Sequence, residues 1–309
     1  MGTFFLCVQA VCPLLTFILL GYVLRLSGLV SDQGFMDLRR LAVTVLIPFT
    51  NFQSIHHADF FAVFPGNAIL LGCTLVIVLF LLVSFLTPHI VGREMAPTVI
   101  HGIMHPNMSI IGIPLARELL GEDYLPEFVI LLSFLCIVLS GLMVVNHQRY
   151  AATQSPPLRT VVNIFKTPIL LGAILGMLFS LLPFQFPPLA ENLFSMFEGV
   201  CGPLALMALD GSFSFQSLTI KPVVFACLGR LVLVPAAVLS LAILFKINGE
   251  QTLLLMLVFI CPTALLCQML SESVSGDPKI GAQIVVYSSV FSVPTIFFWL
   301  YLTLSLLER

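Results

Sequence analysis

The chain has 309 residues, of which 59% are apolar and 9% are charged, and its formal net charge is -2. An ordinary soluble domain has about 25% charged residues, so this composition excludes a soluble globular protein and indicates a chain that folds in a lipid bilayer. The charge balance offers no basic stripe for a nucleic acid, and no nucleic-acid partner is expected.

Long apolar segments follow one another along the chain, and a spanning helix needs about 20 mostly apolar residues. Seven uncharged runs have this scale: 1–24, 66–88, 95–116, 128–146, 167–190, 251–271 and 280–307. Three further spans are shorter or carry charges: 38–55, 189–209 and 222–245. The sequence therefore predicts an all-α polytopic membrane protein with ten transmembrane helices.

The placement of basic residues predicts the orientation, because cytoplasmic loops keep Lys and Arg. With the amino terminus outside, most of the 13 Lys and Arg residues fall on the cytoplasmic side. We therefore expect both termini to be external and the protein to be an integral, multi-pass protein of the cell (inner) membrane. The first apolar run has no basic residue before it, so it is predicted to be the first span rather than a cleaved signal peptide.

A constant offset of 155 residues relates helix-punctuating residues of the two halves. The matching pairs are Pro13 and Pro168, Gly21 and Gly176, Pro48 and Pro203, and Gly121 and Gly276. The offset predicts a duplication into two five-helix repeats, 1–146 and 161–309, joined by a cytoplasmic linker at 147–160. In a chain this apolar, a duplication is typical of a membrane transporter with two inverted halves.

Two predicted spans are interrupted at equivalent places. Pro106 lies at the midpoint of 95–116 and Pro262 at the midpoint of 251–271, and adding 155 to 106 gives 261, one residue from Pro262. Broken helices in matching positions of two repeats are the best sequence pointer to a transporter site. Each break leaves unpaired amides and carbonyls with partial charges of about half a unit, so the amide ends could hold a small anion.

Polar and ionisable side chains at membrane depth are costly and suggest function. Arg230 either attracts the anion or bridges to the carbonyl ends of a broken helix, and Glu198 is a candidate proton or cation carrier unless it lies near the outer surface. His101 and His105 share a helix face at the spacing of a metal pair, but no third ligand is near in sequence. His105 beside the break is instead a candidate substrate contact or proton acceptor. No metal and no cofactor is predicted, and the eight scattered cysteines are expected to pack as small apolar residues.

Several strings resemble the auxin efflux carrier family. The most specific is the N-x4-G-I-P-L string of residues 107–115, which is followed by Gly121 and looks like the motif of that family's fourth helix. Residues 202–206, residues 261–264 and Arg230 before Pro235 look like its seventh, ninth and eighth helices. The chain departs from the family where Gln268 follows Pro262 by six residues, since the family commonly has a polar residue such as Asn closer to the proline.

The resemblance implies a ten-helix fold of two inverted five-helix repeats, shared with bile-acid and sodium/proton carriers, in which the broken helices 95–116 and 251–271 cross. A scaffold made largely of 1–24, 38–55, 167–190 and 189–209 would move against a transport domain in an elevator-type alternating access. The family's substrates are mainly small organic anions, carboxylates in particular, and a homodimer is expected. The family's site carries over to Asn107 and Pro106, and also to Pro262 and Arg230.

We therefore expect a secondary transporter of a small organic anion, with coupling to protons, to sodium or to voltage left open. The candidate substrate-binding residues are His105, Pro106, Asn107, Ser109, Pro262, Thr263, Asn51, Gln268 and Ser133, and the electrostatic or coupling candidates are Arg230 and Glu198. A membrane sensor and a channel are the alternatives. An intramembrane enzyme is not expected, because we find no H-E-x-x-H motif, no G-x-S-x-G motif and no paired carboxylates at helical spacing in the predicted broken helices.

Overall fold

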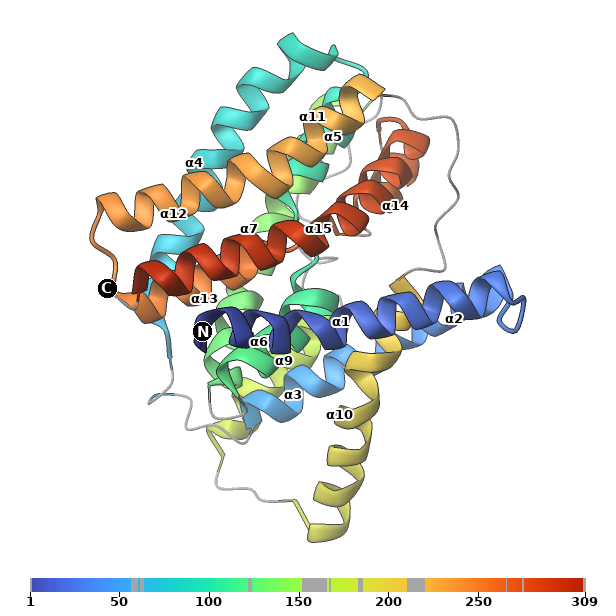
Figure 1. Ribbon diagram of the computed structural model, residues 1–309, viewed down its shortest axis with the longest axis vertical. Helices are drawn as coiled ribbons and strands as arrows, with labels where there is room; N and C mark the ends of the chain where they lie inside the picture. The colour runs from blue at the N-terminus through green and yellow to red at the C-terminus, as the bar shows by residue number, and fades with distance from the viewer. Residues whose placement is uncertain are drawn as a thin grey trace.

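The computed structural model describes residues 2–56, 61, 64–121, 124–151, 166, 168–182, 186–209, 220–264, 266–273 and 275–307, and the chain is helical through nearly all of them (Figure 1). The elements are α1 (Gly2–Leu26), α2 (Asp32–Leu41), η1 (Ala42–Leu46), α3 (Ile47–His56), α4 (Gly66–Val91), α5 (Ala96–Met104), η2 (Met108–Gly112), α6 (Ile113–Leu120), α7 (Leu125–Tyr150), α9 (Pro168–Ser180), α10 (Pro188–Leu209), α11 (Ile220–Leu228), η4 (Gly229–Leu233), α12 (Val234–Leu244), α13 (Gly249–Phe259), α14 (Leu266–Ser273) and α15 (Pro278–Leu307). The η elements are single π-helical turns.

Five helices of the described chain are long and apolar enough to cross a membrane by themselves. They are Phe4–Leu26, Gly66–Val91, Leu125–Tyr150, Lys221–Leu244 and Pro278–Leu307. Three of the other predicted spans fall on helices that are short or interrupted: 38–55 on α2, η1 and α3, 95–116 on α5, η2 and α6, and 251–271 on α13 and α14. The span 189–209 falls on α10. The structure is therefore that of a helical membrane protein, and the count of ten spans stays a prediction.

Two predicted boundaries differ from the structure. The apolar run 167–190 was expected to be one helix, but α9 ends at Ser180, residues 186–187 are not helical, and α10 begins at Pro188. Prolines at 187 and 188 favour a new helix start, because proline lacks the amide that a continuing helix needs but is tolerated in its first turn. At the other boundary, α7 continues to Tyr150, so the first residues of the predicted linker are helical.

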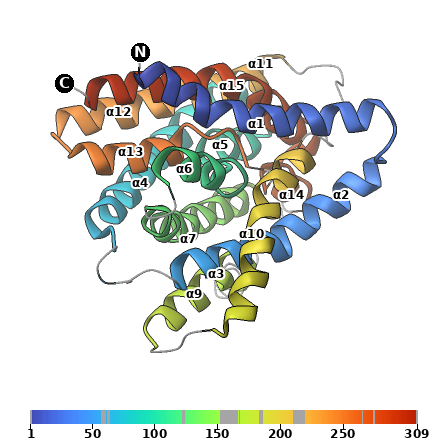
Figure 2. The ribbon, with the colours of Figure 1, turned by 60° about the horizontal axis from the view of Figure 1, so that its bottom comes forward.

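One group of helices consists of α1, α2, η1, α3, α9 and α10, and within it α1 packs along α10 and α3 along α9 (Figure 2). Glycines allow both close approaches. A Cβ added at Gly21 of α1 would lie 2.3 Å from the carbonyl oxygen of Met207, and one added at Gly176 of α9 would lie 2.8 Å from that of Phe52. Gly21 and Gly176 are 155 residues apart, and so are Phe52 and Met207. The two contacts are therefore reciprocal with respect to the sequence repeat.

The remaining helices, α4 to α7 and α11 to α15, form a second group that contains both broken helices. Its core is closely packed: residues 128–132 of α7 and residues 255–259 of α13 have no exposed surface. The side chain of Trp299 on α15 donates a hydrogen bond of 2.8 Å to the carbonyl oxygen of Leu231 in η4. This bond satisfies a backbone group of a π-helical turn, as apolar surroundings require.

Candidate functional site

The two broken helices meet at their breaks and pair through the backbone. The amide of Asn107 donates to the carbonyl oxygen of Pro262 at 2.7 Å, and the amide of Ala264 donates to the carbonyl oxygen of His105 at 2.9 Å. Pro106 and Thr263 thereby form an antiparallel bridge. Proline removes a helical hydrogen bond, and in a buried setting the freed groups need other partners. Here each break satisfies the other, so the predicted residues around Pro106 and Pro262 do come together.

The side chain of Thr263 holds the crossing in place. Its hydroxyl donates to the carbonyl oxygen of Gly102 in the last turns of α5 at 2.7 Å, and its backbone amide donates to the hydroxyl oxygen of Ser288 on α15 at 3.1 Å. All of these groups are buried. Ser288 was not predicted, because nothing in the sequence indicates that this residue of the last span reaches the break.

Arg230 is fully buried, and its guanidinium lies at the carboxyl ends of both first half-helices. Nη1 donates to the carbonyl oxygens of Ile103 at 3.1 Å and Met104 at 3.4 Å, and Nη2 donates to the carbonyl oxygen of Phe259. Of the two roles considered for Arg230, the structure has the bridge to the carbonyl ends. A cation at this position compensates the negative ends of α5 and α13.

The other half-helices present their amide ends near the same crossing. Asn107 is the residue before η2, and its Nδ2 is a buried donor without a hydrogen-bond partner among the described residues. Ser109 lies two residues further along η2. The amides of a helical first turn have no partner inside the helix. The start of η2 therefore places a buried side-chain amide donor beside backbone amides that have no partner within the helix.

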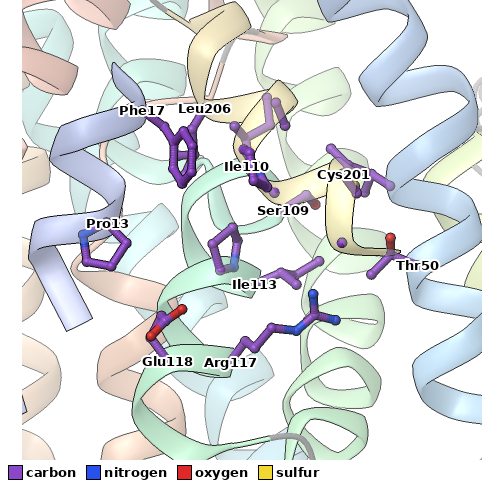
Figure 3. Close-up of a pocket in the computed structure, with 16 residues that line it drawn as sticks. Pro13, Phe17, Thr50, Ser109, Ile110, Ile113, Arg117, Glu118, Cys201 and Leu206 are labelled. Carbon is purple, nitrogen blue, oxygen red and sulfur yellow. The ribbon is translucent and has the colours of Figure 1, made fainter. Parts of the chain in front are cut away.

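A cavity of about 330 Å³ lies beside η2 and α6 (Figure 3). Its walls come from α1, α3 and α10 on one side and from η2–α6 on the other. It is lined by Pro13, Phe17, Ile47, Thr50, Ser109, Ile110, Ile113, Pro114, Arg117, Glu118, Gly199, Cys201, Gly202, Pro203, Ala205 and Leu206. Arg117 points across the cavity toward Thr50, whereas Glu118 lies on the side of Pro13. The cavity is thus mostly apolar, with a few polar groups, one cationic side chain (Arg117) and one anionic side chain (Glu118).

The predicted site residues divide between these places. Ser109 lines the cavity, whereas Asn51 is fully buried in α3 and its neighbour Thr50 takes the place in the lining. Ser133 bonds the carbonyl oxygen of Val129 in its own helix α7 at 2.7 Å.

Of the remaining two predicted residues, Gln268 is not part of the cavity lining. Gln268 is half-buried on α14, where its backbone packs against Gly281 of α15. The backbone of Glu198 belongs to α10, but its side chain lies outside the described part of the structure. Arg117, which lines the cavity, was not among the predicted site residues.

Three buried imidazoles form a hydrogen-bonded chain next to the crossing. Nε2 of His101 lies 3.1 Å from Nδ1 of His105, and Nδ1 of His101 lies 3.0 Å from Nε2 of His147. The first two rings share the face of α5 that the sequence predicted, and the third comes from α7, 46 residues away. Within the described residues, no group of three His, Cys, Asp or Glu side chains could hold a metal ion. The three rings follow one another in a line and do not converge on a common point.

One of the comparisons with known proteins agrees with a membrane protein. A comparison with individual curated proteins gives no match. The model of the family described as "Membrane transport protein" matches residues 6–300 and therefore nearly the whole chain. The chain belongs to this family, the auxin efflux carrier family of membrane transporters.

Proposed function

We propose that this protein is a secondary transporter of a small organic anion, a carboxylate, and that it works by elevator-type alternating access. The observation that carries the proposal is the cavity beside η2 and α6, where Arg117 and Ser109 stand in a mostly apolar lining and Glu118 lies apart from them on the side of Pro13. Small-molecule sites are typically clefts of about 300–1,000 Å³ with apolar walls and a few placed polar groups. A substrate with a carboxylate and an apolar part fits this composition.

The distribution of charge supports an anionic substrate. Arg230 is committed to the carbonyl ends of α5 and α13, so the negative ends of the half-helices are compensated. The amide end of η2, with the Nδ2 donor of Asn107, remains for a negatively charged group. Arg117 adds a guanidinium, whose fork geometry suits a carboxylate.

The position of the cavity supports alternating access. One wall belongs to the group that holds α1, α3 and α10, and the other belongs to the half-helix that starts at the crossing. A displacement of one group against the other would carry a ligand bound to η2 with it. The reciprocal glycine contacts of Gly21 and Gly176 support the inverted-repeat origin that such a movement requires.

The test is uptake of radiolabelled malate, malonate and an aromatic carboxylate into proteoliposomes, with a membrane potential imposed in either direction. We expect saturable uptake with counterflow, which distinguishes a carrier from a channel. Movement of a monovalent anion is worth about 2.3 kcal/mol per 100 mV, so the response to potential shows whether net charge moves. Binding without flux would instead indicate a sensor.

Two variants connect the flux to the site. Asn107→Ala and Arg117→Gln are each expected to raise the half-saturating concentration by about ten-fold or more, because each removes a donor to the carboxylate. Arg93→Gln is the matched control, since Arg93 is exposed in the turn before α5. Absence of flux of any carboxylate, with folded protein in the vesicles, would contradict the proposed function.

A further inference from the structure

The three imidazoles next to the crossing connect it to the end of α7. The series of hydrogen bonds continues from His147 to Ser275. Nδ1 of His147 lies 2.8 Å from the carbonyl oxygen of Ser275, and the hydroxyl of Ser275 donates to the carbonyl oxygen of His147 at 2.8 Å. His101 and His147 have no exposed surface and His105 has 3%. Ser275 lies in the turn before α15 and is half-buried. The line of groups therefore runs from the break in the first broken helix to the protein surface.

The carbonyl of Ser275 determines the direction of every hydrogen bond in the chain. A carbonyl oxygen only accepts, so Nδ1 of His147 carries the hydrogen, and in the neutral ring Nε2 is then an acceptor. Nδ1 of His101 must donate to that acceptor, which leaves Nε2 of His101 to accept from Nδ1 of His105. The three neutral rings are thus polarised in one direction. Nε2 of His105 remains as an acceptor, and no described residue hydrogen-bonds to it.

Other ionisable groups near the rings come from neighbouring elements. Arg230 of η4 bonds the carbonyls of residues 103 and 104, directly before His105. Cys267 of α14 bonds the carbonyl of Thr98, and the amide of Asp277 donates to the hydroxyl of Thr98, one turn before His101. Among the described residues, α4, α11 and α15 contribute no hydrogen bond to the rings. Within the described part of the chain, no carboxylate oxygen hydrogen-bonds to any of the three rings.

We propose that His105, His101 and His147 form a proton path between the helix crossing and the face of the protein at Ser275, and that it makes the proton the coupling ion of transport. This inference rests on the proposed function and deepens it. A proton binds to Nε2 of His105 while the Nδ1 proton of that ring passes to Nε2 of His101. The Nδ1 proton of His101 passes to Nε2 of His147, the Nδ1 proton of His147 passes to the hydroxyl oxygen of the half-buried Ser275, and the hydroxyl proton of Ser275 leaves to water. One proton enters, one leaves, and no electron moves.

The end at Ser275 can stabilise the tautomers that one passage leaves behind, and the three rings must turn back to their first orientation before the next passage. After one passage, Nδ1 of His147 is an acceptor that faces the carbonyl oxygen of Ser275, which cannot donate. The hydroxyl of Ser275 lies 3.4 Å from the same nitrogen and can turn from the carbonyl of His147 to donate to it. The face at Ser275 also carries Arg149 and Lys279, basic residues of the side that we expect to be cytoplasmic.

The test measures proton and carboxylate movement in the same proteoliposomes, with a trapped pH-sensitive dye and a radiolabelled carboxylate. In the wild type, carboxylate uptake should be accompanied by proton movement. In His101→Gln the side chain can hydrogen-bond but cannot relay a proton, so substrate-driven proton flux should fall by about 100-fold while carboxylate exchange, which needs no net proton movement, continues. His147→Gln interrupts the same path at a second point. His89→Gln is the matched control, since His89 is exposed on α4 and outside the chain.

Each outcome decides the proposal. Carboxylate transport without proton movement in the wild type, or undiminished proton flux in both path variants, would overturn the proton path and leave the proposed function intact. If the wild type moves no carboxylate, the proposed function fails and NMR of the histidine ring nitrogens decides the path. Protonation changes that spread through all three rings, and that His101→Gln uncouples, would support it. Rings that titrate independently would refute it.

Discussion

The backbone amide of Asn107 donates to the carbonyl oxygen of Pro262 at 2.7 Å, and this bond joins the breaks of two helices that are far apart in the sequence. Proline interrupts the backbone hydrogen bonding of both helices, and here the amide of one break and the carbonyl oxygen of the other become partners. Because the two breaks supply each other's hydrogen-bond partners, a substitution that moves one broken helix should also alter the position of the other.

Thr263→Val should destabilise the crossing. The substitution removes the hydroxyl that donates to the carbonyl oxygen of Gly102 at 2.7 Å and leaves that buried oxygen without this donor. The expected loss is about 1–3 kcal/mol of unfolding free energy, measured as a lower thermal unfolding midpoint in detergent. Thr74→Val is the control, because Thr74 bonds its own helix α4 on an exposed face. Equal midpoints for the two variants would contradict the role given to Thr263.

Arg230→Met should be among the most destabilising single substitutions in the chain. It removes the guanidinium that bonds carbonyls of both α5 and α13, and hydrogen bonds to charged groups are worth about 1.5–3 kcal/mol each. Arg230→Lys should recover only part of the loss, because one ammonium group does not reproduce the planar fork. Thermal unfolding of the purified variants measures both effects.

Arg25→Met is the matched control for that series. Arg25 forms a 3.0 Å ion pair with Asp32 at the end of α1, where Asp32 is mostly exposed. Exposed ion pairs contribute about 0–1 kcal/mol, so the midpoint should change little. A loss as large as that of Arg230→Met would show that bridging of the carbonyl ends is not what stabilises the protein.

Gly21→Ala and Gly176→Ala should both destabilise the first group of helices. The new methyl groups would lie 2.3 Å from the carbonyl oxygen of Met207 and 2.8 Å from that of Phe52, so the backbones must separate. Overpacking of this kind costs about 1–3 kcal/mol, and the tighter contact at Gly21 predicts the larger effect. In Gly141→Ala the added Cβ meets no atom within 4 Å, and stability should be kept or slightly raised. Thermal midpoints compare the three variants.

Cys201 offers a way to detect substrate in the cavity without any substitution. Its residue lines the cavity, and a small water-soluble thiol reagent should label it slowly, as found by peptide mass spectrometry. A carboxylate at about ten times its dissociation constant should reduce the labelling rate by about ten-fold, because it occupies the space beside the thiol. Cys7 has no exposed surface and serves as the internal control for unfolding. A rate unaffected by every transported carboxylate would place the substrate elsewhere.

Local chemistry made much of this protein predictable from its sequence. Apolar composition and the prolines at 106 and 262 act on the residues next to them, so the helices, their breaks and the matching positions of the breaks could be inferred before any contact was known. The family could be inferred from the string that begins at Asn107. The end of α9 at Ser180 was missed, because an uncharged apolar run does not show where a helix stops.

The partners of each break were decided only in three dimensions. From the sequence, Arg230 could either attract the anion or bridge to the carbonyl ends of a broken helix. It bonds the carbonyl ends because of how η4 packs against both broken helices. The ring of His147, on another helix, hydrogen-bonds to the ring of His101. Thr50, and not its predicted neighbour Asn51, lines the cavity. These outcomes depend on the rotation and depth at which whole helices pack together. In a chain this apolar, lipid-facing and buried surfaces have the same composition, so the sequence carries no signal for that packing and the tertiary structure alone determines it.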